Sequence, residues 1–216
     1  MTASDHIPVR SFKIKVCGMK DAQNIREVAS LSPDYLGFIF YAPSARYAAE
    51  VDPELLNDLP AGIKKTGVFV NEEAEQIKYW IEKMGLDAVQ LHGSESPAFC
   101  REMLALNVEV IKAFGVDEHF DFNILNEYTD SVDYFLFDTK TPAHGGSGKL
   151  FDWTLLQQNK TTKPFFLSGG IDTGQLDEIR QIDDSRLYAI DVNSKFEISP
   201  GIKDYTKLEA IFKKIL

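Results

Sequence analysis

The amino-acid sequence predicts an α/β fold, a (β/α)8 TIM barrel that forms a single domain. Short apolar runs alternate with segments of helical periodicity along the chain, and this alternation yields eight strand–helix units. No Pro- or Ser-rich linker divides the units. Alternating strands and helices form a parallel sheet with right-handed crossovers, and eight units in 216 residues close most naturally as a barrel. The alternative is a doubly wound open sheet, which would normally leave a strand at a visible switch point.

The strands are expected where apolar residues run together or alternate with polar ones. The first run alternates from Lys13 to Cys17 and stops at Gly18, as a strand followed by a turn does. The sixth run, residues 134–137, is almost entirely apolar and aromatic, which is typical of a strand buried on both faces. In order, the predicted strands span residues 13–17, 35–40, 65–70, 88–91, 108–113, 134–137, 165–167 and 187–190.

The helices are expected where apolar residues recur at helical spacing behind a capping residue. Asp21 is an N-cap candidate for the first helix, Pro53 opens the second, and Ser94 precedes the fourth. The predicted helices span residues 21–30, 52–59, 72–84, 95–106, 120–128, 153–158, 172–182 and 203–215. Residues 1–12 are interpreted as an N-terminal lead-in and residues 13–216 as the barrel catalytic domain.

Charge and composition restrict the partners. The formal net charge is −10, which argues against nucleic acid or an anionic membrane surface, because both need a basic face. A small anionic substrate remains compatible with this charge, since a site can be locally positive. The N-terminus lacks the apolar core of a signal peptide, and the two cysteines form no CxxC pattern. We therefore expect a cytoplasmic protein without a disulfide framework or a metal site.

Asp138 is the first candidate for a catalytic group. It ends the sixth apolar run, and residues 139–149 after it hold one Pro and three Gly. In barrels of this kind the active site lies where strands end, and a glycine-rich segment can close over it as a flap. The alternative is that Asp138 only caps a turn.

Further candidates stand at other strand ends. Cys17 ends the first strand as a nucleophile, a base or a small buried apolar residue, whereas Cys100 falls within a helix and is interpreted as structural. His92 is placed to line a site as a hydrogen-bonding partner. Arg46, after a Pro and a Ser in the second loop, is either a surface charge or a clamp for a carboxylate or phosphate.

A phosphate site is predicted at the last two loops. Gly169 and Gly170 precede a predicted helix whose N-terminus would offer free N–H groups, and Asn193 and Ser194 follow the eighth strand. Barrels commonly bind phosphate at the loops after strands seven and eight. Two adjacent glycines are by themselves also compatible with a simple turn.

Together these segments resemble the phosphoribosylanthranilate isomerase family. The resemblance covers the chain from about Lys13 to the C-terminus. It rests on KVCGMK (15–20), LGFIFYAPSARY (36–47), GVFVN (67–71), VQLHGSE (89–95), FDT (137–139) with GGSGKLFDW (145–153), LSGGI (167–171) and DVNSKFEISPGIKD (191–204).

The resemblance implies a cofactor-free Amadori rearrangement in tryptophan biosynthesis. The substrate would be N-(5-phosphoribosyl)anthranilate and the product 1-(2-carboxyphenylamino)-1-deoxyribulose 5-phosphate. It further implies that Cys17 is the general base and Asp138 the general acid, and that Arg46 holds the anthranilate carboxylate.

The other binding residues follow from the same resemblance. The seventh and eighth loops would hold the phosphate, and the segment with Gly145 and Gly146 would close as a flap. The small phosphorylated substrate is the partner that we expect, and the chain would act as a monomer or a homodimer.

The chemistry sets two demands on the proposed pair. Opening the furanose ring needs a proton on its oxygen, so Asp138 must enter the cycle protonated, a form that burial beneath a closed flap would favour. A free thiol titrates near pH ~8.5, so Cys17 needs positive charge or N–H donors nearby to act as a thiolate at neutral pH.

One position departs from the family pattern. Where the family's last loop usually reads Ser-Ser-Gly-Val-Glu, this chain has residues 193–197 as Asn-Ser-Lys-Phe-Glu. Lys195 thus stands at a position where the glycine suggests a positive φ. The hypothesis is that Lys195 adds a charge contact to the phosphate instead.

Three other functions compete with this interpretation. A pentose-phosphate epimerase would need a His/Asp metal set at strand ends, where only His92 is placed for it. An indole-glycerol-phosphate synthase would need a Lys and Glu constellation at strand ends, which is not clear in this sequence. A non-enzymatic barrel that binds a phosphorylated metabolite would not need both Cys17 and Asp138.

Overall fold

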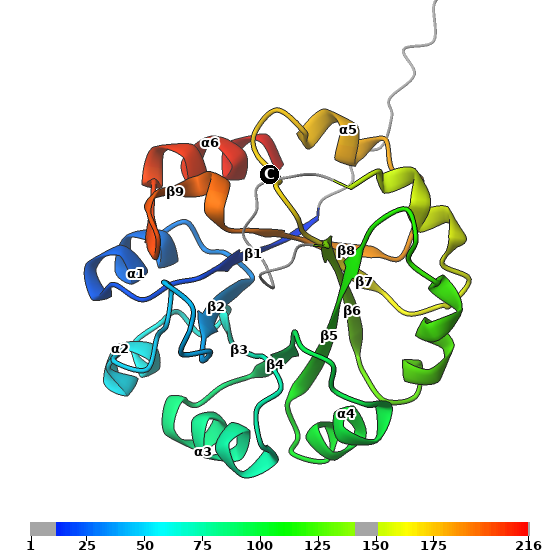
Figure 1. Cartoon of the computed structure of the whole chain (residues 1–216). Coiled ribbons are helices and arrows are strands. Elements are labelled where there is room, and N and C mark those ends of the chain that lie inside the picture. The colour runs from blue at the N-terminus through cyan, green and yellow to red at the C-terminus, as the bar shows by residue number, and fades with distance from the viewer. Residues whose placement is uncertain (1–11, 141–150, 216) are drawn as a thin grey trace, which may run out of the picture.

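Eight parallel strands close into a barrel, which confirms the predicted fold. The computed structural model describes residues 12–140 and 151–215. Each strand pairs with its neighbour in sequence, and β1 pairs with β8 to close the ring (Figure 1). The strands are β1 (Lys13–Cys17), β2 (Tyr35–Ile39), β3 (Lys64–Phe69), β4 (Ala88–Leu91), β5 (Glu109–Val116), β6 (Tyr134–Thr139), β7 (Phe165–Leu167) and β8 (Leu187–Val192).

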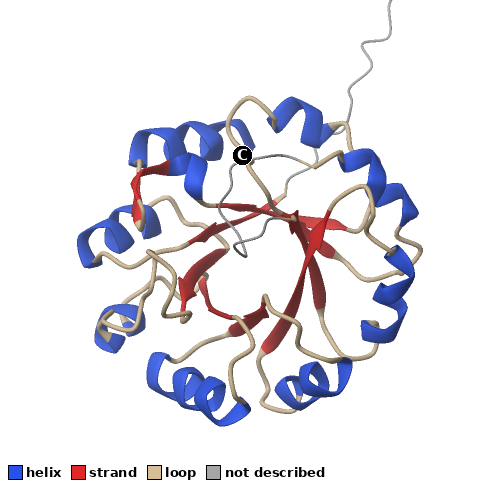
Figure 2. Ribbon diagram, viewed as in Figure 1, coloured by secondary structure: helices blue, strands red, loops and turns tan. Residues whose placement is uncertain are grey.

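Helices surround the barrel as an outer ring (Figure 2). The α-helices are α1 (Ala22–Ala29), α2 (Pro53–Asn57), α3 (Ala74–Met84), α4 (Pro97–Leu104), α5 (Leu176–Arg180) and α6 (Tyr205–Ile215). Three 3₁₀ helices complete the ring: η1 (Phe122–Tyr128), η2 (Trp153–Gln158) and η3 (Ser194–Phe196). None of the helices in the described ranges, 12–140 and 151–215, is long and apolar enough to cross a membrane.

Several predicted elements differ from the structure in type or length. The fifth and sixth helices are 3₁₀ rather than α, and each starts behind an Asp whose carboxylate accepts the N–H two residues on, a tight turn that suits the narrower helix. The seventh helix begins at Leu176 instead of residue 172. Asp172 accepts the N–H of Gly174 at 2.6 Å, so the backbone there is held in a turn.

Three strands run further than the sequence pattern indicates, and one of them is β5, which continues to Val116. β6 continues through Asp138 to Thr139, and β8 continues through Asp191 to Val192. Both aspartates are inward-facing residues of the sheet, so the apolar pattern stops before the strand does. A small hairpin of β9 (Glu197–Ser199) and β10 (Ile202–Lys203) was not predicted. It is paired antiparallel and lies beside α1 and α6 in Figure 1.

The side-chain alternation of the strands divides the core into two parts. A large outer cluster lies between the strands and the helices, with residues such as Val16, Phe38 and Phe137. A smaller cluster fills the barrel itself, formed by Tyr35, Ala88, Ile111, Ala113, Leu136, Phe166 and Ala189. Because side chains alternate along a strand, inward positions toward the carboxyl ends share the phase of this inner cluster. Those positions carry the polar residues of the site.

Candidate active site

Polar and charged residues occupy the inward positions of the strands between the inner apolar cluster and the mouth of the barrel. Residues two or four places after the inner-cluster residues keep the inward phase, which brings one set of side chains to the mouth of the barrel. This set is Cys17 on β1, Gln90 and His92 at β4, Asp138 on β6, Ser168 after β7, and Asp191 and Asn193 at β8. The predicted candidates Cys17, His92, Asp138 and Asn193 thus face one region.

Cys17 lies beside a buried ion pair. Its exposed fraction is 4%, and Lys15, two residues earlier on the same face, is fully buried. The register of β1 and β8 places Lys15 opposite Asp191, and Lys15 Nζ lies 3.0 Å from Asp191 Oδ1. Burial by itself lowers the pKa of Lys15, but Asp191 and Cys17 together raise it above its ordinary value. Lys15 therefore stays charged next to the thiol.

The proton stays on Cys17 in this environment. Burial raises the pKa of the Cys17 thiol and the charge of Asp191 adds to this rise, while the charges of Lys15 and Lys203 lower the pKa without cancelling it. The positive charge that the sequence required is present, yet the thiol form dominates at neutral pH. The sulfur is also packed closely, because a Cβ on Gly37 would lie 2.8 Å from Sγ.

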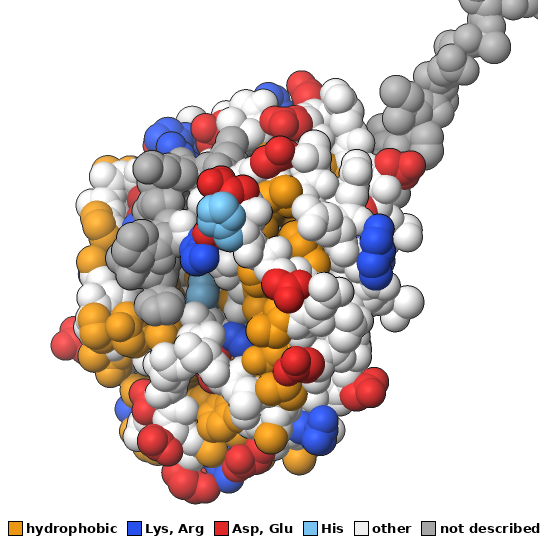
Figure 3. Space-filling model, turned by 45° about the vertical axis from the view of Figure 1, so that its right-hand side comes forward, with side chains coloured by type: hydrophobic (Ala, Val, Ile, Leu, Met, Phe, Trp, Pro, Cys, Tyr) orange, Lys and Arg blue, Asp and Glu red, His pale blue; other side chains and the backbone are white. Residues whose placement is uncertain are grey.

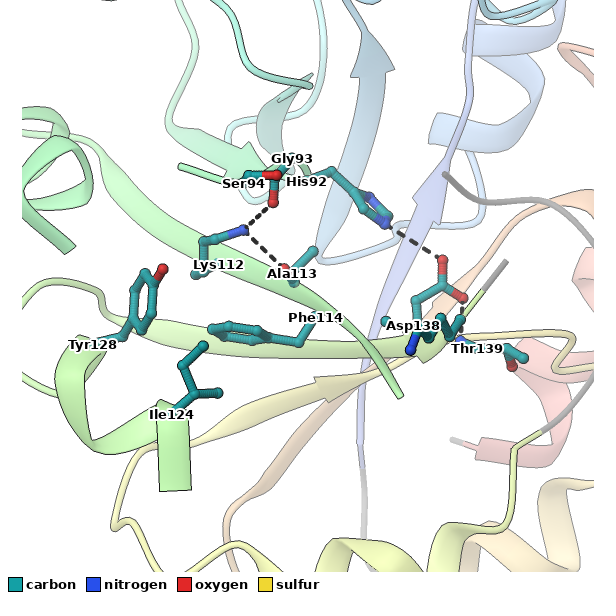
Figure 4. Close-up of a pocket in the computed structure, with 12 residues that line it drawn as sticks. His92, Gly93, Ser94, Lys112, Ala113, Phe114, Ile124, Tyr128, Asp138 and Thr139 are labelled. Carbon is teal, nitrogen blue, oxygen red and sulfur yellow. Dashed lines mark hydrogen bonds and ion pairs between the residues drawn. The ribbon is translucent and has the colours of Figure 1, made fainter. Parts of the chain in front are cut away.

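Asp138 is held between a backbone donor and a histidine. Its Oδ1 accepts the N–H of Thr139 at 2.8 Å, and its Oδ2 lies 3.5 Å from Nε2 of His92 (Figure 4). Gly169 approaches from β7 with φ +90°, and a Cβ there would lie 3.1 Å from Asp138 Oδ1. Only a glycine fits this approach, which explains one of the two adjacent glycines without reference to a ligand.

A cavity of about 460 Å³ opens next to His92 and Asp138. Phe114, Ile124 and Tyr128 form its apolar side, and Lys112 and Lys140 contribute to its polar lining. Figure 4 shows His92 turned toward Asp138, while the apolar residues Phe114, Ile124 and Tyr128 lie away from that contact. On the face in Figure 3, hydrophobic side chains form a band beside a hollow that contains basic and histidine side chains. The cavity therefore joins an apolar surface to the polar mouth of the barrel.

Arg46 belongs to a second charged cluster, with Glu197, Lys203 and Asn193. Arg46 Nε lies 2.8 Å from Glu197 Oε1, and Nη2 lies 2.6 Å from Oε2, a bidentate contact. Lys203 Nζ donates to Glu197 Oε1 and to Asn193 Oδ1, each at 2.7 Å. A Cβ on Gly18 would meet Arg46 and Asn193, so this cluster lies against the residue after Cys17.

Glu197 is the anion of this cluster. Burial opposes its charge, but Arg46 and Lys203 outweigh burial and lower the pKa of Glu197 to about 2. With Glu197 bound to Nε and Nη2, no hydrogen bond to the described residues occupies Nη1 of Arg46. Arg46 therefore keeps a donor that an anionic ligand could use.

The predicted phosphate loops have a different local structure from the one expected. Gly169 and Gly170 both have positive φ, but α5 begins six residues later and has only five residues. The expected helix N-terminus behind the glycines is thus absent, and the N–H groups there belong to a turn. Asn193 and Ser194 follow β8, as predicted.

Lys195 is unstrained. It lies in η3, it is exposed, and it is not among the non-glycine residues with positive φ in the described ranges. The expectation of a positive φ at this position is therefore wrong, because the 3₁₀ turn accommodates the chain. Gly145 and Gly146 lie outside the described residues.

Sequence reasoning missed the charged partners of the site. The partners of Lys15 and Arg46 lie 176 and 151 residues away, so no local pattern indicates them. The signal for Lys15 was its position two residues before Cys17, which places both on one face of β1. Across residues 12–140 and 151–215, no group of three or more His, Cys, Asp or Glu side chains could hold a metal ion.

Comparisons with known proteins agree on one family. The family model described as N-(5'phosphoribosyl)anthranilate (PRA) isomerase matches residues 14–214. The N-(5'-phosphoribosyl)anthranilate isomerase of Parabacteroides distasonis is 44% identical over 205 residues, 94% of this chain and 93% of the relative.

Solved structures give the same result. Phosphoribosyl anthranilate isomerase from Thermotoga maritima has a TM-score of 0.84 at 36% identity, covering 94% of this chain and 98% of the other. A phosphoribosyl anthranilate isomerase in complex with reduced 1-(o-carboxyphenylamino)-1-deoxyribulose 5-phosphate has a TM-score of 0.78 at 31% identity, with the same coverage.

The low pKa of Glu197 predicts an acid-sensitive contribution to stability. A carboxyl group that titrates near 4.5 when unfolded and at about 2 when folded stabilises the protein above pH 4.5, and this contribution is lost as the pH falls toward 2. It amounts to about 3 kcal/mol of the free energy of unfolding. Glu197→Gln should lack this pH dependence and should lose about 3–5 kcal/mol at neutral pH, because Lys203 stays buried without its anion.

Urea unfolding between pH 5 and pH 2 measures this contribution. Glu209→Gln is the matched control, because Glu209 forms an exposed ion pair with Lys213. It should change the free energy of unfolding by less than ~1 kcal/mol. If the free energy of unfolding depended on pH in the same way for wild type and for Glu197→Gln, the low pKa of Glu197 would be contradicted.

Proposed function

The chain belongs to the N-(5'-phosphoribosyl)anthranilate isomerase family, whose reaction is a step of tryptophan biosynthesis, and on that premise we propose that Cys17 is the general base and Asp138 the general acid. The main support for this assignment is that both side chains occupy inward-facing positions at the carboxyl ends of their strands. Both are buried, both face the mouth of the barrel, and each has a basic neighbour: Lys15 beside Cys17 and His92 beside Asp138.

The proposed reaction is an Amadori rearrangement of N-(5'-phosphoribosyl)anthranilate. Asp138 gives its proton to the furanose ring oxygen, the C1–O bond breaks, and the anthranilate nitrogen forms a Schiff base with C1. The Schiff base makes the C2 proton acidic, and Cys17 removes that proton. The resulting enolamine is protonated at C1 and loses its hydroxyl proton, which leaves the 2-ketose product.

Lys15 supports the base in this scheme. A buried thiol is a poor base because its charged form lacks solvation, and Lys15 supplies a positive charge that favours the thiolate. Asp191 keeps Lys15 on the inner face of the barrel through the contact at 3.0 Å. We assign Lys15 and Asp191 as positioning residues that set the protonation of Cys17.

The charged groups at the mouth suit the two anionic ends of the substrate. Arg46 would bind the anthranilate carboxylate through Nη1, while Glu197 fixes the guanidinium plane. The phosphate would bind at Gly169, Gly170, Asn193 and Ser194, the two loops next to Asp138 and Arg46.

Two further proposals concern the binding of substrate. Gly145 and Gly146 would belong to the flap over the bound substrate. His92 would line the site beside Asp138. The matched relatives are isomerases over nearly their whole length, so the epimerase, synthase and sensor alternatives lose their support.

Removal of either catalytic group should nearly abolish turnover. Cys17→Ala and Asp138→Asn should each lower kcat/KM by about 10²–10⁴-fold, the usual contribution of a positioned acid or base. The substrate, formed in situ from anthranilate and phosphoribosyl pyrophosphate, carries the anthranilate fluorophore, so the loss of its fluorescence reports the rate. Cys100→Ala is the matched control, a buried thiol within α4 that should retain full activity. Unchanged rates in either active-site variant would contradict the assignment.

The raised pKa of Cys17 predicts a rate that increases with pH as long as Asp138 keeps its proton. Below the pKa of Cys17 the thiolate fraction grows tenfold per pH unit, so kcat/KM should rise with pH over the range in which the general acid stays protonated. Lys15 lowers the pKa of Cys17, so its removal should shift the profile to higher pH and reduce activity at pH 7 by at least about tenfold.

The experiment compares Lys15→Met with Lys15→Met/Asp191→Asn. The double variant leaves no unpaired carboxylate in the core, and it should still shift the profile upward because Lys15 affects Cys17 more than Asp191 does. A folded double variant with the wild-type pH profile would show that Lys15 does not act on the base.

Lys195 is proposed to add a charge contact to the phosphate. It is exposed on η3, next to Ser194. Lys195→Ala should weaken competitive inhibition by inorganic phosphate by up to about fivefold at low salt, the range of an exposed ion pair. Lys213→Ala on α6 is the control for general charge. Equal inhibition constants for wild type and Lys195→Ala would sink the proposal.

A further inference from the structure

Gln90 connects the interior of the barrel to the proposed acid. Its exposed fraction is 1%, and it faces inward on β4 in the same phase as His92. Gln90 Nε2 lies 3.0 Å from His92 Nδ1, and His92 Nε2 lies 3.5 Å from Asp138 Oδ2. The three side chains therefore form a chain of contacts: Nδ1 of His92 contacts Gln90, and Nε2 of His92 contacts Asp138.

The backbone around His92 is fixed independently of Gln90. Glu95 accepts the N–H of Gly93 at 2.9 Å and the N–H of Asn71 at 2.9 Å, and its carboxylate lies 3.1 Å from Lys112 Nζ. Lys112 in turn donates to the carbonyl of Gly93 at 2.8 Å (Figure 4). These contacts hold the residue after His92 from both sides. The loop therefore sets the position of the imidazole ring, and Gln90 is left to determine which ring nitrogen carries the proton.

The contact with Gln90 determines the tautomer. An amide NH₂ that faces Nδ1 donates to it, so Nδ1 must offer a lone pair and the single proton of the neutral ring must be on Nε2. Gln90 Oε1 is buried and finds no hydrogen-bond donor in the described residues. A rotated amide would place two N–H groups at that position, and unpaired buried N–H groups are rarer in proteins than unpaired carbonyl oxygens. The donating orientation is thus favoured.

This tautomer suits the chemistry proposed for Asp138. Thr139 N–H already occupies Oδ1, so the acidic proton belongs on Oδ2, the oxygen that faces His92. A ring with its proton on Nε2 does not accept that proton, which leaves it available to the substrate. After the proton has moved to the furanose oxygen, the same Nε2–H can donate to the new carboxylate. The hydrogen bond between His92 and Asp138 is then stronger after the proton transfer than before it. An interaction that strengthens as the reaction proceeds lowers the barrier.

We propose that Gln90 is a positioning residue that holds His92 in the neutral tautomer protonated on Nε2, so that His92 stabilises the Asp138 carboxylate formed during ring opening. This inference rests on the proposed function only for its catalytic consequence. The tautomer itself follows from the contacts of Gln90 and His92.

The tautomer is measured directly by ¹⁵N NMR of imidazole-labelled protein. The chain has four histidines, and His92→Asn assigns the resonances of His92 by their disappearance. In the wild type, Nδ1 of His92 should resonate as an unprotonated nitrogen and Nε2 as a protonated one. Gln90→Glu replaces the donor by an acceptor and should protonate Nδ1, and Gln90→Leu should give a mixture of tautomers. A wild-type ring protonated only on Nδ1, or no change in either variant, would overturn the proposal.

Thr66→Val is the matched control. Thr66 is another buried inward side chain on the neighbouring strand β3, and its hydroxyl also lacks a hydrogen-bond partner among the described residues. The variant should leave the His92 resonances and the rate unchanged. Loss of the tautomer in Thr66→Val would show that the ring responds to general disturbance of the core, which would overturn the specific role of Gln90.

Kinetics separate this proposal from the assignment of Asp138. Gln90→Leu should lower kcat by about 10- to 100-fold, the range of one hydrogen bond to a charged group, with KM nearly unchanged. In the Asp138→Asn background the same change should have almost no further effect. If the NMR result holds but the two effects on kcat multiply, Gln90 sets the tautomer and the general acid lies elsewhere. An unaltered kcat in Gln90→Leu would refute the catalytic role of the tautomer.

Discussion

The ion pair between Lys15 and Asp191 is the contact on which the rest of the site depends. It joins β1 to β8 at the seam where the barrel closes, and both side chains are buried. A buried pair of this kind costs desolvation energy that apolar residues would not, so stability alone does not explain it. Its position beside Cys17 fits the role that we propose for that residue. The contact joins the two strands of the seam, and it would supply the charge that a buried thiol needs to act as a base.

The protein is acidic overall, yet the mouth of the barrel contains its buried cations. Lys15, Lys112 and Lys203 are almost completely inaccessible, and Arg46 is partly buried. Each is paired with a carboxylate: Asp191, Glu95 or Glu197. The partners of Lys15 and Arg46 come from distant parts of the chain. The net charge of −10 therefore describes the outer surface, while the buried cations lie where we propose that the carboxylate and the phosphate of the substrate bind. The pairing also fixes the geometry, since a cation with one bound carboxylate keeps its remaining donors in a defined direction.

The sequence predicts the fold well because the barrel is encoded locally. Eight short apolar runs at regular spacing specify eight strands, and strand phase then directs Cys17, His92, Asp138 and Asn193 to one end. The prediction fails where tertiary contacts compete with the local pattern, as at the seventh helix, where the side chain of Asp172 holds the backbone in a turn. It also fails where an inward polar residue ends an apolar run inside a strand, as at Asp138. The long-range pairs of Lys15, Arg46 and His92 need the folded chain, so their consequences for the protonation of Cys17 and for the orientation of Asp138 were not predictable. The catalytic roles themselves stay predictions.

The most direct test of the catalytic assignment is a crystal structure of this chain with reduced 1-(o-carboxyphenylamino)-1-deoxyribulose 5-phosphate, the compound in the complex of a related isomerase. In that complex, Cys17 Sγ should lie within contact distance of the sugar C2, and Asp138 Oδ2 should lie within hydrogen-bond distance of the oxygen that leaves the ring. The carboxylate should contact Arg46 Nη1, and the phosphate should lie at Gly169, Gly170 and Ser194. A complex in which C2 faces Asp138, or in which neither side chain reaches the reacting atoms, would contradict the roles proposed for Cys17 and Asp138.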